Sequence, residues 1–522
     1  MMIISYLGRW EYPWFYFTLT ENASLAEENA TLKRQVAMLQ EHVFGQKTEK
    51  RQVVREDAPD QLSLFNEAEV ETKKNAEEPS ITVGEHTRTK KKKSSREELL
   101  AALPHERELI DLPEDEKVCP DCGSELKPVG ETYIRKEVIL IPAKVKIVEY
   151  YQINYECREC RKEKAPKFIK PVMPQPVIPH SFASPSAVAH VMMQKYFYAV
   201  PLYRQEKEWQ QLGISLSRAN LANWIIISTQ EWLSLIYDRM HDKLLKENYL
   251  HADETPVQVH KEKGRKNTSK SYMWLYASGQ FEPQHAIRLF EYQPTRKGEN
   301  AVAFLKGFTG YLHTDDFAGY GKLEIRQCLC MAHARRKFVD AIKGIADPQA
   351  NSLSQEALDL IGALYAKEKE FKDLSPEERQ IERQKQEKPL LEALFAWLEK
   401  NRDCVAIKSP ISKAINYTLS NWEGLTRYLE DGHCSIDNNL AENSIRPFTV
   451  GRKNWLFSDS PKGAKASAMV YSIIETCKAN QIDPEKYLIQ VFTDFPNLDV
   501  RHHPEVVDGY MPWSTRMQEL CK

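Results

Sequence analysis

Each of two candidate β-strands ends in a pair of adjacent acids, and this feature limits the possible folds more than any other. The apolar run that starts at Tyr249 ends in Asp253 and Glu254, and a second short run ends in Asp315 and Asp316. Buried carboxylates are costly unless they are paired or bind a metal. Neighbouring residues of a strand point to opposite faces of a sheet, so only one acid of each pair can face a common point. The pattern predicts a sheet in which one acid from each strand meets the other.

A third acid, Glu442, stands in a helical context in the stretch DNNLAENSIRPF and is followed by basic residues. Three carboxylates that converge from two strands and a helix suit Mg²⁺, which prefers oxygen ligands and keeps positions open for water and phosphate. Two such ions can activate the attacking oxygen and stabilise the leaving oxygen of an in-line phosphoryl transfer. The alternative is structural, because acids at strand ends are often solvated or cap the next element.

The same two strands allow a different centre. His251 shares a strand face with Asp253, and His313 shares one with Asp315. Two His-x-Asp pairs could form a hydrolase site for Zn²⁺ or Mn²⁺. Lone histidines on strands are more often structural, so the two interpretations remain open from the residues alone.

Two Cys-x-x-Cys pairs predict a structural zinc site, and its ligands would be Cys119, Cys122, Cys157 and Cys160. Four thiolates form the closed tetrahedral set that structural zinc prefers. The segment between the pairs is typical of two strands with a turn near Pro142, which would bring the pairs together as a zinc ribbon. A four-thiolate site has no open position, so we expect a scaffold or DNA-contacting role rather than catalysis.

Leucines recur at heptad spacing near the N-terminus, and the a positions between them hold one asparagine and two valines. The d positions are Leu25, Leu32 and Leu39, and the a positions are Asn29, Val36 and Val43. A single asparagine among β-branched a residues favours a parallel two-stranded coiled coil, and hence a homodimer. An amphipathic helix packed on its own chain is the alternative.

A helix-turn-helix pattern follows. One helix is predicted to end near Leu212, Gly213 can supply a left-handed turn, and Ser217 can cap the next helix. The second helix would bury Leu221, Trp224 and Ile225 and would offer Ser217, Arg218, Asn220 and Asn223 to a DNA groove. An ordinary helical hairpin is the alternative.

Further strands are predicted after the first acid pair. The stretch SYMWLYASG alternates aromatic residues with Met273, Leu275 and Ala277, which is the period of a β-strand, and HAIRLFEYQ is another candidate. The stretch IRQCLCMAHARRKFVDAI is typical of a strand that passes into a helix. The segment from Ala464 predicts an amphipathic helix.

The length of 522 residues predicts a multidomain α+β protein. The expected parts are a coiled-coil helix (21–46), a disordered linker (47–101), the zinc ribbon (102–172), a helical DNA-binding region (173–248), a mixed α/β core in two parts (249–345 and 432–490), an all-helical insertion between them (346–431) and a C-terminal tail (491–522). The net charge of −2 supplies no global attraction to nucleic acid, so DNA binding must come from local patches. No stretch is typical of a transmembrane helix, and we expect a cytoplasmic protein with reduced cysteines.

Seven stretches, taken in chain order, match one family: LAEENATLKRQVAMLQEHVFGQKTEK, CPDCGSEL, SFASPSAVAHVMMQKYFYAVPLYRQEKEWQQLGISLSRANLANW, HADETPV, GYLHTDDFAGY, CMAHARRKF and ENSIRPFTVGRKNWLFSDSPKGAKA. Through them the chain resembles the bacterial insertion sequence 66 family of transposases, from the predicted coiled coil to about Leu488. The resemblance implies an RNase-H-like mixed α/β catalytic core, interrupted by the all-helical insertion.

The resemblance also implies a DDE triad of metal ligands. The first is Asp253 in HADET, and the third is Glu442 in AENSIRPF. The second is Asp315, since the family has an aspartate, one residue and then an aromatic, here Phe317. The assignment leaves Glu254 as a neighbour without a role, and likewise Asp316.

The implied activity is cleavage and strand transfer at element ends, with Mg²⁺ or Mn²⁺ at the triad, double-stranded DNA as partner and accessory proteins of the same element. Candidate DNA-backbone contacts are Arg446, Arg452 and Lys453, and a second set is Arg335 and Arg336. We interpret His333 with Cys330 as local structure rather than as ligands. The alternative function is a non-catalytic zinc-ribbon and helix-turn-helix regulator from a decayed element, although the three intact carboxylates argue against decay.

Overall fold

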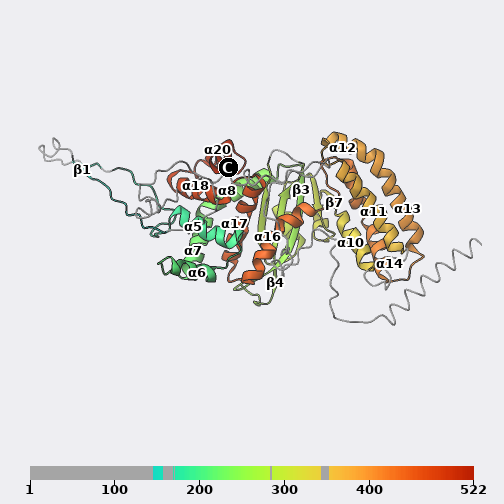
Figure 1. Ribbon diagram of the computed structural model, residues 1–522, viewed down its shortest axis with the longest axis horizontal. Helices are drawn as coiled ribbons and strands as arrows, with labels where there is room; N and C mark the ends of the chain where they lie inside the picture. The colour runs from blue at the N-terminus through green and yellow to red at the C-terminus, as the bar shows by residue number, and fades with distance from the viewer. Residues whose placement is uncertain (1–144, 157–167, 170, 282–284, 343–351) are drawn as a thin grey trace, which may run out of the picture. The chain divides into compact units, whose positions relative to one another are not determined.

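The computed structural model describes residues 145–156, 168–169, 171–281, 285–342 and 352–522 (Figure 1). The predicted coiled coil, the linker and the four predicted zinc ligands lie outside these residues. Within them, no helix is both long enough and apolar enough to cross a bilayer.

A mixed sheet lies at the centre of the described structure (Figure 1). Its strands are β3 (Tyr249–Val259), β4 (Lys270–Ser278), β5 (Arg288–Gln293), β6 (Tyr311–Thr314), β7 (Arg326–Leu329) and β8 (Phe457–Ser458). The order is β5-β4-β3-β6-β7, and β8 pairs with the end of β3. Strand β4 runs antiparallel to both of its neighbours, β3 and β5, whereas β6, β7 and β8 run parallel to β3. The strands predicted from the alternating pattern are therefore present.

One predicted boundary needs correction, because β3 does not end at its acids. Asp253 lies opposite Leu275 of β4, and the strand continues to Val259. Pro256 lies within the strand, and pairing with β4 continues on both sides of it. In the described sheet, pairing of β3 with β6 stops at His251 and pairing with β8 begins at Gln258. Pro256 therefore lies where one edge of the strand has no partner, which is where a missing backbone donor costs least.

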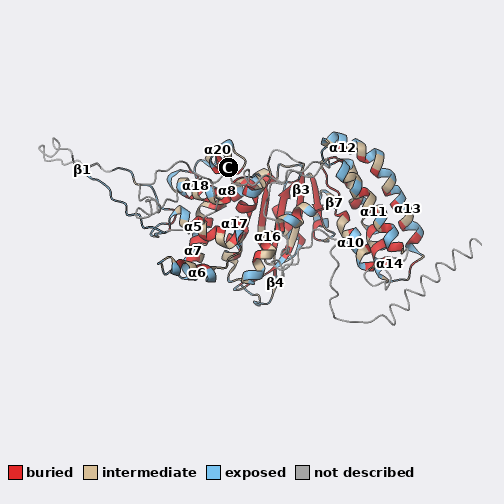
Figure 2. Cartoon of the chain, viewed as in Figure 1, coloured by how far each residue is buried: buried red, intermediate tan, exposed pale blue. Residues whose placement is uncertain are grey.

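Helices cover both faces of the sheet, and its strands are largely buried (Figure 2). On one face Phe290 of β5 packs against Phe448 of α16 (Asn439–Trp455) and Tyr471 of α17 (Pro461–Ala479). On the other face Tyr276 stacks on Phe304 of α9 (Gly298–Phe304), with 4.0 Å between ring centroids. The sheet is thus the middle layer of three.

Helix α17 differs from its prediction as an amphipathic helix. It is buried along most of its length from Ala464 to Cys477 because it packs on β5 and on the helices before the sheet. A helix enclosed in this way needs apolar or internally bonded residues around most of its circumference. Ser472 illustrates this, since its hydroxyl accepts the amide of Phe290 and donates to Ala468.

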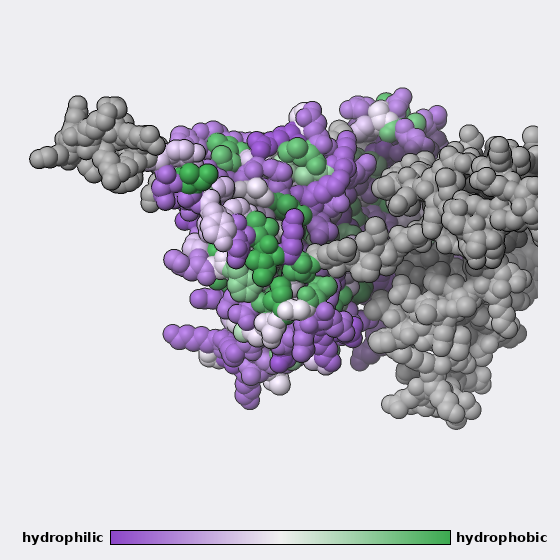
Figure 3. Space-filling view, turned by 60° about the vertical axis from the view of Figure 1, so that its left-hand side comes forward, coloured by the Kyte–Doolittle hydropathy of each residue, from purple (hydrophilic) through white to green (hydrophobic). Residues whose placement is uncertain are grey.

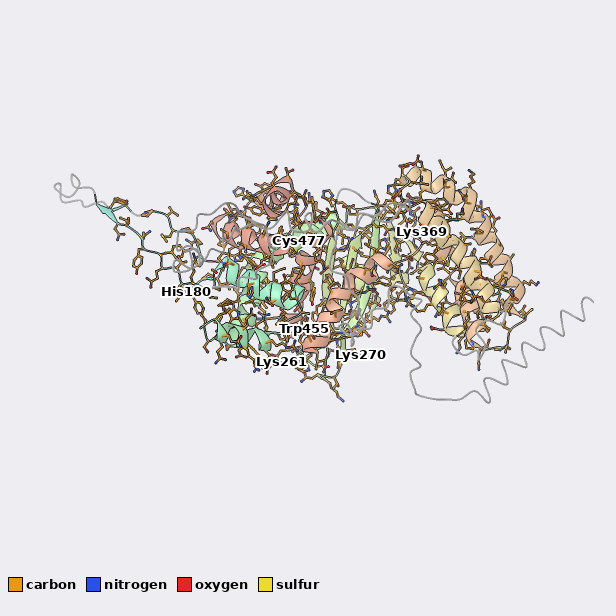
Figure 4. The ribbon with its side chains drawn as sticks, viewed as in Figure 1. His180, Lys261, Lys270, Lys369, Trp455 and Cys477 are labelled. Carbon is orange, nitrogen blue, oxygen red and sulfur yellow. The ribbon has the colours of Figure 1, made fainter. Side chains whose placement is uncertain are left out.

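The region before the sheet is helical, as predicted. It contains α5 (Pro185–Met192), α6 (Leu202–Gln211), α7 (Arg218–Ser228) and α8 (Ser234–Leu244), with π-helical turns at Met193–Phe197 and Thr229–Leu233. Lys195, in the first of these turns, lies over the ring of Trp455, 4.0 Å from the centroid. Trp455, at the end of α16, is labelled in Figure 4. Figure 3 shows one face on which hydrophobic side chains gather within a hydrophilic surround.

The C-terminal segment 491–522 is not the tail that we predicted. It contains the end of α18 (Pro484–Asp494), α19 (Pro504–Asp508) and α20 (Thr515–Cys521). Phe495, Tyr510 and Met517 are buried in the main hydrophobic core. Apolar residues spaced along short helices carry too weak a pattern to reveal this packing from sequence.

The insertion is all-helical over its described residues. Its helices are α11 (Leu353–Glu370), α12 (Pro376–Glu382), α13 (Lys388–Arg402), α14 (Pro410–Ser420) and α15 (Trp422–Thr426), with a π-helical turn at Arg383–Glu387. They pack on α10 (Met331–Ile342), which follows β7, and share a hydrophobic core with it. Arg383 is fully buried and is held by Glu368 and by three backbone carbonyls.

The predicted zinc region is described only in part. Of the second strand expected between the cysteine pairs, the described residues form a strand only at β1 (Tyr155–Glu156). It pairs antiparallel with β2 (Phe168–Ile169), beyond the second cysteine pair. The first strand of the predicted hairpin lies outside the described residues, so the hairpin stays a prediction.

Candidate active site

The parallel pairing of β3 with β6 brings the first two acids of the predicted triad together. His251 lies opposite His313 in this ladder. Asp253 and Asp315 each follow two residues later, so Asp253 within β3 lies beside Asp315, which follows the end of β6. Since β6 ends at Thr314, Asp315 begins the loop after the strand.

The third acid comes from the first turn of α16, which is fastened to β3 by the residue before it. The Asn438 side chain donates to the carbonyl oxygen of Ala252 at 2.8 Å, and its Oδ1 lies 2.9 Å from His251 Nδ1. Both bonds are buried. Asn438 thereby places Glu442, one turn later, above the acid-bearing part of β3.

All three acids line one cavity of about 350 Å³, which Arg336, Arg446 and His333 also line. Burial and then the neighbouring carboxylates raise the pKa of Asp253 to about 8. The Oε1 atom of Glu442 is buried without a hydrogen-bond partner in the described structure. Three neighbouring carboxylates, one with a raised pKa and another with an unbonded oxygen, are suited to hold a divalent cation, which would remove the electrostatic cost.

Glu254 is also among the residues that line this cavity, but its carboxylate leaves the opposite face of β3 and is bonded there. It accepts hydrogen bonds from the Tyr320 hydroxyl at 2.7 Å and from Arg296 Nε at 2.6 Å. Its side chain is 1% exposed. Burial raises its pKa, and the bonds from Tyr320 and Arg296 oppose that shift. Glu254 is therefore a fully partnered structural carboxylate.

Arg296 also connects to the second acid. Its Nη2 lies 3.7 Å from Asp315 Oδ2, and its guanidinium stacks on Phe317, 4.0 Å from the ring centroid. The amide of Phe317 in turn donates to Asp315 Oδ1 at 3.0 Å. Asp316 is exposed and lines a neighbouring cavity of about 380 Å³ rather than the triad's cavity.

The arrangement of the two strand histidines does not fit a shared His-x-Asp metal centre. Their rings stack on each other with 4.2 Å between centroids, and both are buried. His313 Nδ1 lies 3.1 Å from the carbonyl oxygen of Leu250, and its Nε2 accepts the amide of Ser435 at 2.8 Å. With both nitrogens of His313 bonded, the His-x-Asp hydrolase centre loses one of its ligands, and the histidines pack the layer beneath the acids.

The predicted DNA-contacting residues after the acids differ in position. Arg336 Nη2 lies 3.7 Å from Glu442 Oε2, and Arg446 is exposed at the cavity wall. Arg452 is half-buried and donates to Thr255 Oγ1 at 3.2 Å, so it supports β3. Arg335 and Lys453 are exposed and lie outside the lining of this cavity.

The predicted helix-turn-helix has the expected boundaries. Gly213 has φ +93°, Ser217 caps α7, and Leu221, Trp224 and Ile225 are buried. Asn220 is exposed, and its Oδ1 is bonded to Ser217 in a capping box. Arg218 is exposed and pairs with Glu206 at 3.3 Å, and Asn223 is exposed.

Sequence reasoning missed the residues that support the triad: Arg296, Tyr320 and Asn438. Asn438 had a detectable signal, because asparagine is favoured at the start of a helix. Arg296 and Tyr320 carry no local pattern, since each reaches Glu254 only through the tertiary fold.

Family models of transposase segments match almost the whole chain. A family model described as "Transposase IS66 family" matches residues 180–466, and one described as "IS66 C-terminal element" matches 472–513. Models described as "zinc-finger binding domain of transposase IS66" and "Transposase C of IS166 homeodomain" match 116–161 and 31–107.

Two relatives from Sinorhizobium fredii (strain NBRC 101917 / NGR234) align over nearly the full chain. Uncharacterized protein y4hP is 27% identical over 508 residues, which cover 92% of this chain and 88% of the relative. Uncharacterized protein y4qI is 28% identical over 513 residues, which cover 94% and 90%.

Proposed function

The chain belongs to the IS66 transposase family, and we propose that it is a DDE transposase that cleaves element-end DNA and joins it to target DNA with the help of divalent cations. The observation that carries the proposal is the meeting of Asp253, Asp315 and Glu442 at one cavity. The sheet order, with acids on β3 and just after the parallel strand β6, supports an RNase-H-like core.

The triad fits Mg²⁺ or Mn²⁺ by the nature of its donors. Three carboxylates offer only oxygen, and they lie close enough for Asp315 and Glu442 to raise the pKa of Asp253. Bound there, the cations would activate the attacking oxygen and neutralise charge on the phosphate in an in-line displacement.

The protein's own residues then serve to position the DNA. Arg446 and Arg336 stand at the cavity wall, where a phosphodiester would meet their guanidinium groups. Asn438 ties α16 to β3, which keeps Glu442 in register with Asp253. Such fixed geometry lowers the barrier by removing the need to orient the reacting groups during the reaction.

Other parts of the chain would bind and organise DNA. The zinc-finger match spans Cys119, Cys122, Cys157 and Cys160 and supports a structural zinc. We assign groove contact to the exposed face of α7, with Arg218 and Asn223. Homodimerisation through the heptads of residues 21–46 is part of the same proposal, and so is assistance by accessory proteins of the element.

Substitution of the triad tests the activity. Asp253→Asn, Asp315→Asn and Glu442→Gln should each reduce Mg²⁺-dependent cleavage of element-end DNA at least a thousandfold, because each removes a metal ligand. Binding of the same DNA, measured by gel shift, should persist. Asp316→Asn is the matched control, since it neutralises the adjacent, exposed acid.

Wild-type cleavage by all three triad variants would refute the assignment. DNA binding without cleavage by the wild-type protein, with complete ends and either cation, would instead favour the non-catalytic regulator.

A further inference from the structure

Two buried polar atoms at the triad lack hydrogen-bond partners in the described structure. One is Oε1 of the triad residue Glu442, and the other is Nδ1 of the neighbouring His333. They face each other at 3.9 Å, and both residues line the cavity of the triad. A buried polar atom without a partner costs about 1–3 kcal/mol. Two such atoms facing each other in a site with three acids therefore indicate a shared ligand.

The distance between the two atoms suits a cation. At 3.9 Å they are too far apart to bond to each other. An ion at about 2.0–2.2 Å from each, the usual range for imidazole nitrogen and carboxylate oxygen, fits between them. Cys330 Sγ lies within 4.8 Å of both atoms, but it already accepts the amide of Asn438 at 3.2 Å. The nitrogen and the oxygen are thus the two donors with no other partner.

The fold holds both donors in place. His333 lies in the first turn of α10 and Glu442 in the first turn of α16. The starts of these helices are joined, because Met331 N donates to the carbonyl oxygen of Ile436 at 3.1 Å and Cys330 Sγ accepts from Asn438 N. The two donors therefore keep their spacing without support from a ligand, as a preorganised site requires.

We propose that His333 is a fourth metal ligand of this site, which binds through Nδ1 the same divalent cation that Glu442 binds through Oε1. The inference rests on the proposed function, because it takes the triad as a metal centre. An imidazole ligand shifts preference from Mg²⁺ toward Mn²⁺ and the later first-row ions. The centre would then contain one all-oxygen position and one mixed nitrogen and oxygen position.

Arg336 provides the matched control. It lies one turn after His333 on α10 and approaches the other oxygen of Glu442, with Nη2 3.7 Å from Oε2. Since a guanidinium cannot bind a cation and repels one, Arg336→Gln should leave Mn²⁺ affinity unchanged or increase it. His333→Gln should lower the affinity at least tenfold, because a ligand is lost.

The direct test is electron spin echo spectroscopy of the full-length protein loaded with Mn²⁺. The wild-type protein should show the ¹⁴N modulation of a coordinated imidazole, His333→Gln should lose it, and Arg336→Gln should keep it. Calorimetric titration with Mn²⁺ gives the affinities, and circular dichroism without Mn²⁺ checks that the variants fold.

Bound Mn²⁺ without ¹⁴N modulation in the wild-type protein would overturn the role of His333 and leave the triad intact, and this result needs no variant. Undiminished modulation in His333→Gln would overturn it as well. Failure of the proposed function looks different, since Asp253→Asn and Glu442→Gln would then bind Mn²⁺ as tightly as the wild-type protein.

Discussion

Asp253 and Glu254 are adjacent in the chain, yet their carboxylates have different surroundings because they leave opposite faces of β3. Glu254 is enclosed and bonded by Tyr320 and Arg296. Asp253 faces two other acids, and its bonded neighbour is the amide of Glu254 at 2.8 Å. Alternation along the strand could be predicted, but it does not say which face meets the third acid. The position of α16 decides that.

The raised pKa of Asp253 predicts a pH-dependent stability. Its folded pKa of about 8 lies above the ordinary value of 3.8, so the folded state holds this proton more tightly than the unfolded state. Its contribution is therefore greatest at low pH and is lost as pH rises from about 4 to 8. Without added divalent cation, Asp253→Asn should gain about 3–4 kcal/mol over the wild-type protein between pH 5 and pH 8.

Urea unfolding at the two pH values measures this difference, with Asp316→Asn as the control for an exposed acid. Added Mg²⁺ should remove the advantage of the variant, because cation binding favours the ionised form. An equal response of variant and wild-type protein to pH would contradict the raised pKa.

At the scale of elements, the period of the apolar residues predicted whether a segment is a helix or a strand. It did not predict where the element ends or how far it is buried. The sequence pattern placed β4, β6 and α10 correctly because each has a clear period. It ended β3 at the acids, since an acid pair and Pro256 both break the apolar pattern. It also predicted an amphipathic α17, although tertiary contacts bury most of that helix. Contacts between distant segments leave no local period.

The turn between α6 and α7 gives a prediction at this scale. Gly213 has φ +93°, and no atom lies within 4 Å of the position that a Cβ would occupy, so the cost of substitution is in the backbone alone. Gly213→Ala should destabilise the protein by about 1–2 kcal/mol, because the left-handed conformation is unfavourable for alanine.

Gly321→Ala is the matched control, because it also has open space but no left-handed backbone. Thermal unfolding compares the two variants. Equal melting temperatures would show that the turn relaxes without cost, and the tight helix-turn-helix geometry would lose its support.

At the scale of the whole molecule, the insertion separates Glu442 from the other two acids in sequence while the fold reunites them. Over the described residues the insertion is a helical unit that packs on α10 and on β7, and its hydrophobic cluster includes Tyr249 of β3 and Tyr311 of β6. Met331 N donates to the carbonyl oxygen of Ile436, which joins the residues on either side of the insertion. The insertion therefore shares its apolar core with the sheet that carries the triad.

The zinc site is a whole-molecule prediction, since its ligands lie outside the described residues. Purified protein should contain one zinc per chain by elemental analysis, because the four cysteines complete a tetrahedral site. Cys119→Ser combined with Cys122→Ser should remove the zinc and weaken DNA binding. The double variant should retain the Mn²⁺ affinity of the triad, and zinc content well below one per chain in the wild-type protein would disprove the site.

The sequence by itself determined the family and predicted which residues carry the chemistry. Acid pairs after apolar runs, paired cysteines and the order of the motifs led to Asp253, Asp315 and Glu442 as candidate ligands. Only the tertiary structure decided what surrounds them: Glu254 bonded by Arg296 and Tyr320, α16 fastened by Asn438, and His333 facing Glu442. The reason is physical. Residue type and period are local properties, whereas burial and the distance between side chains depend on segments that meet only when the chain folds.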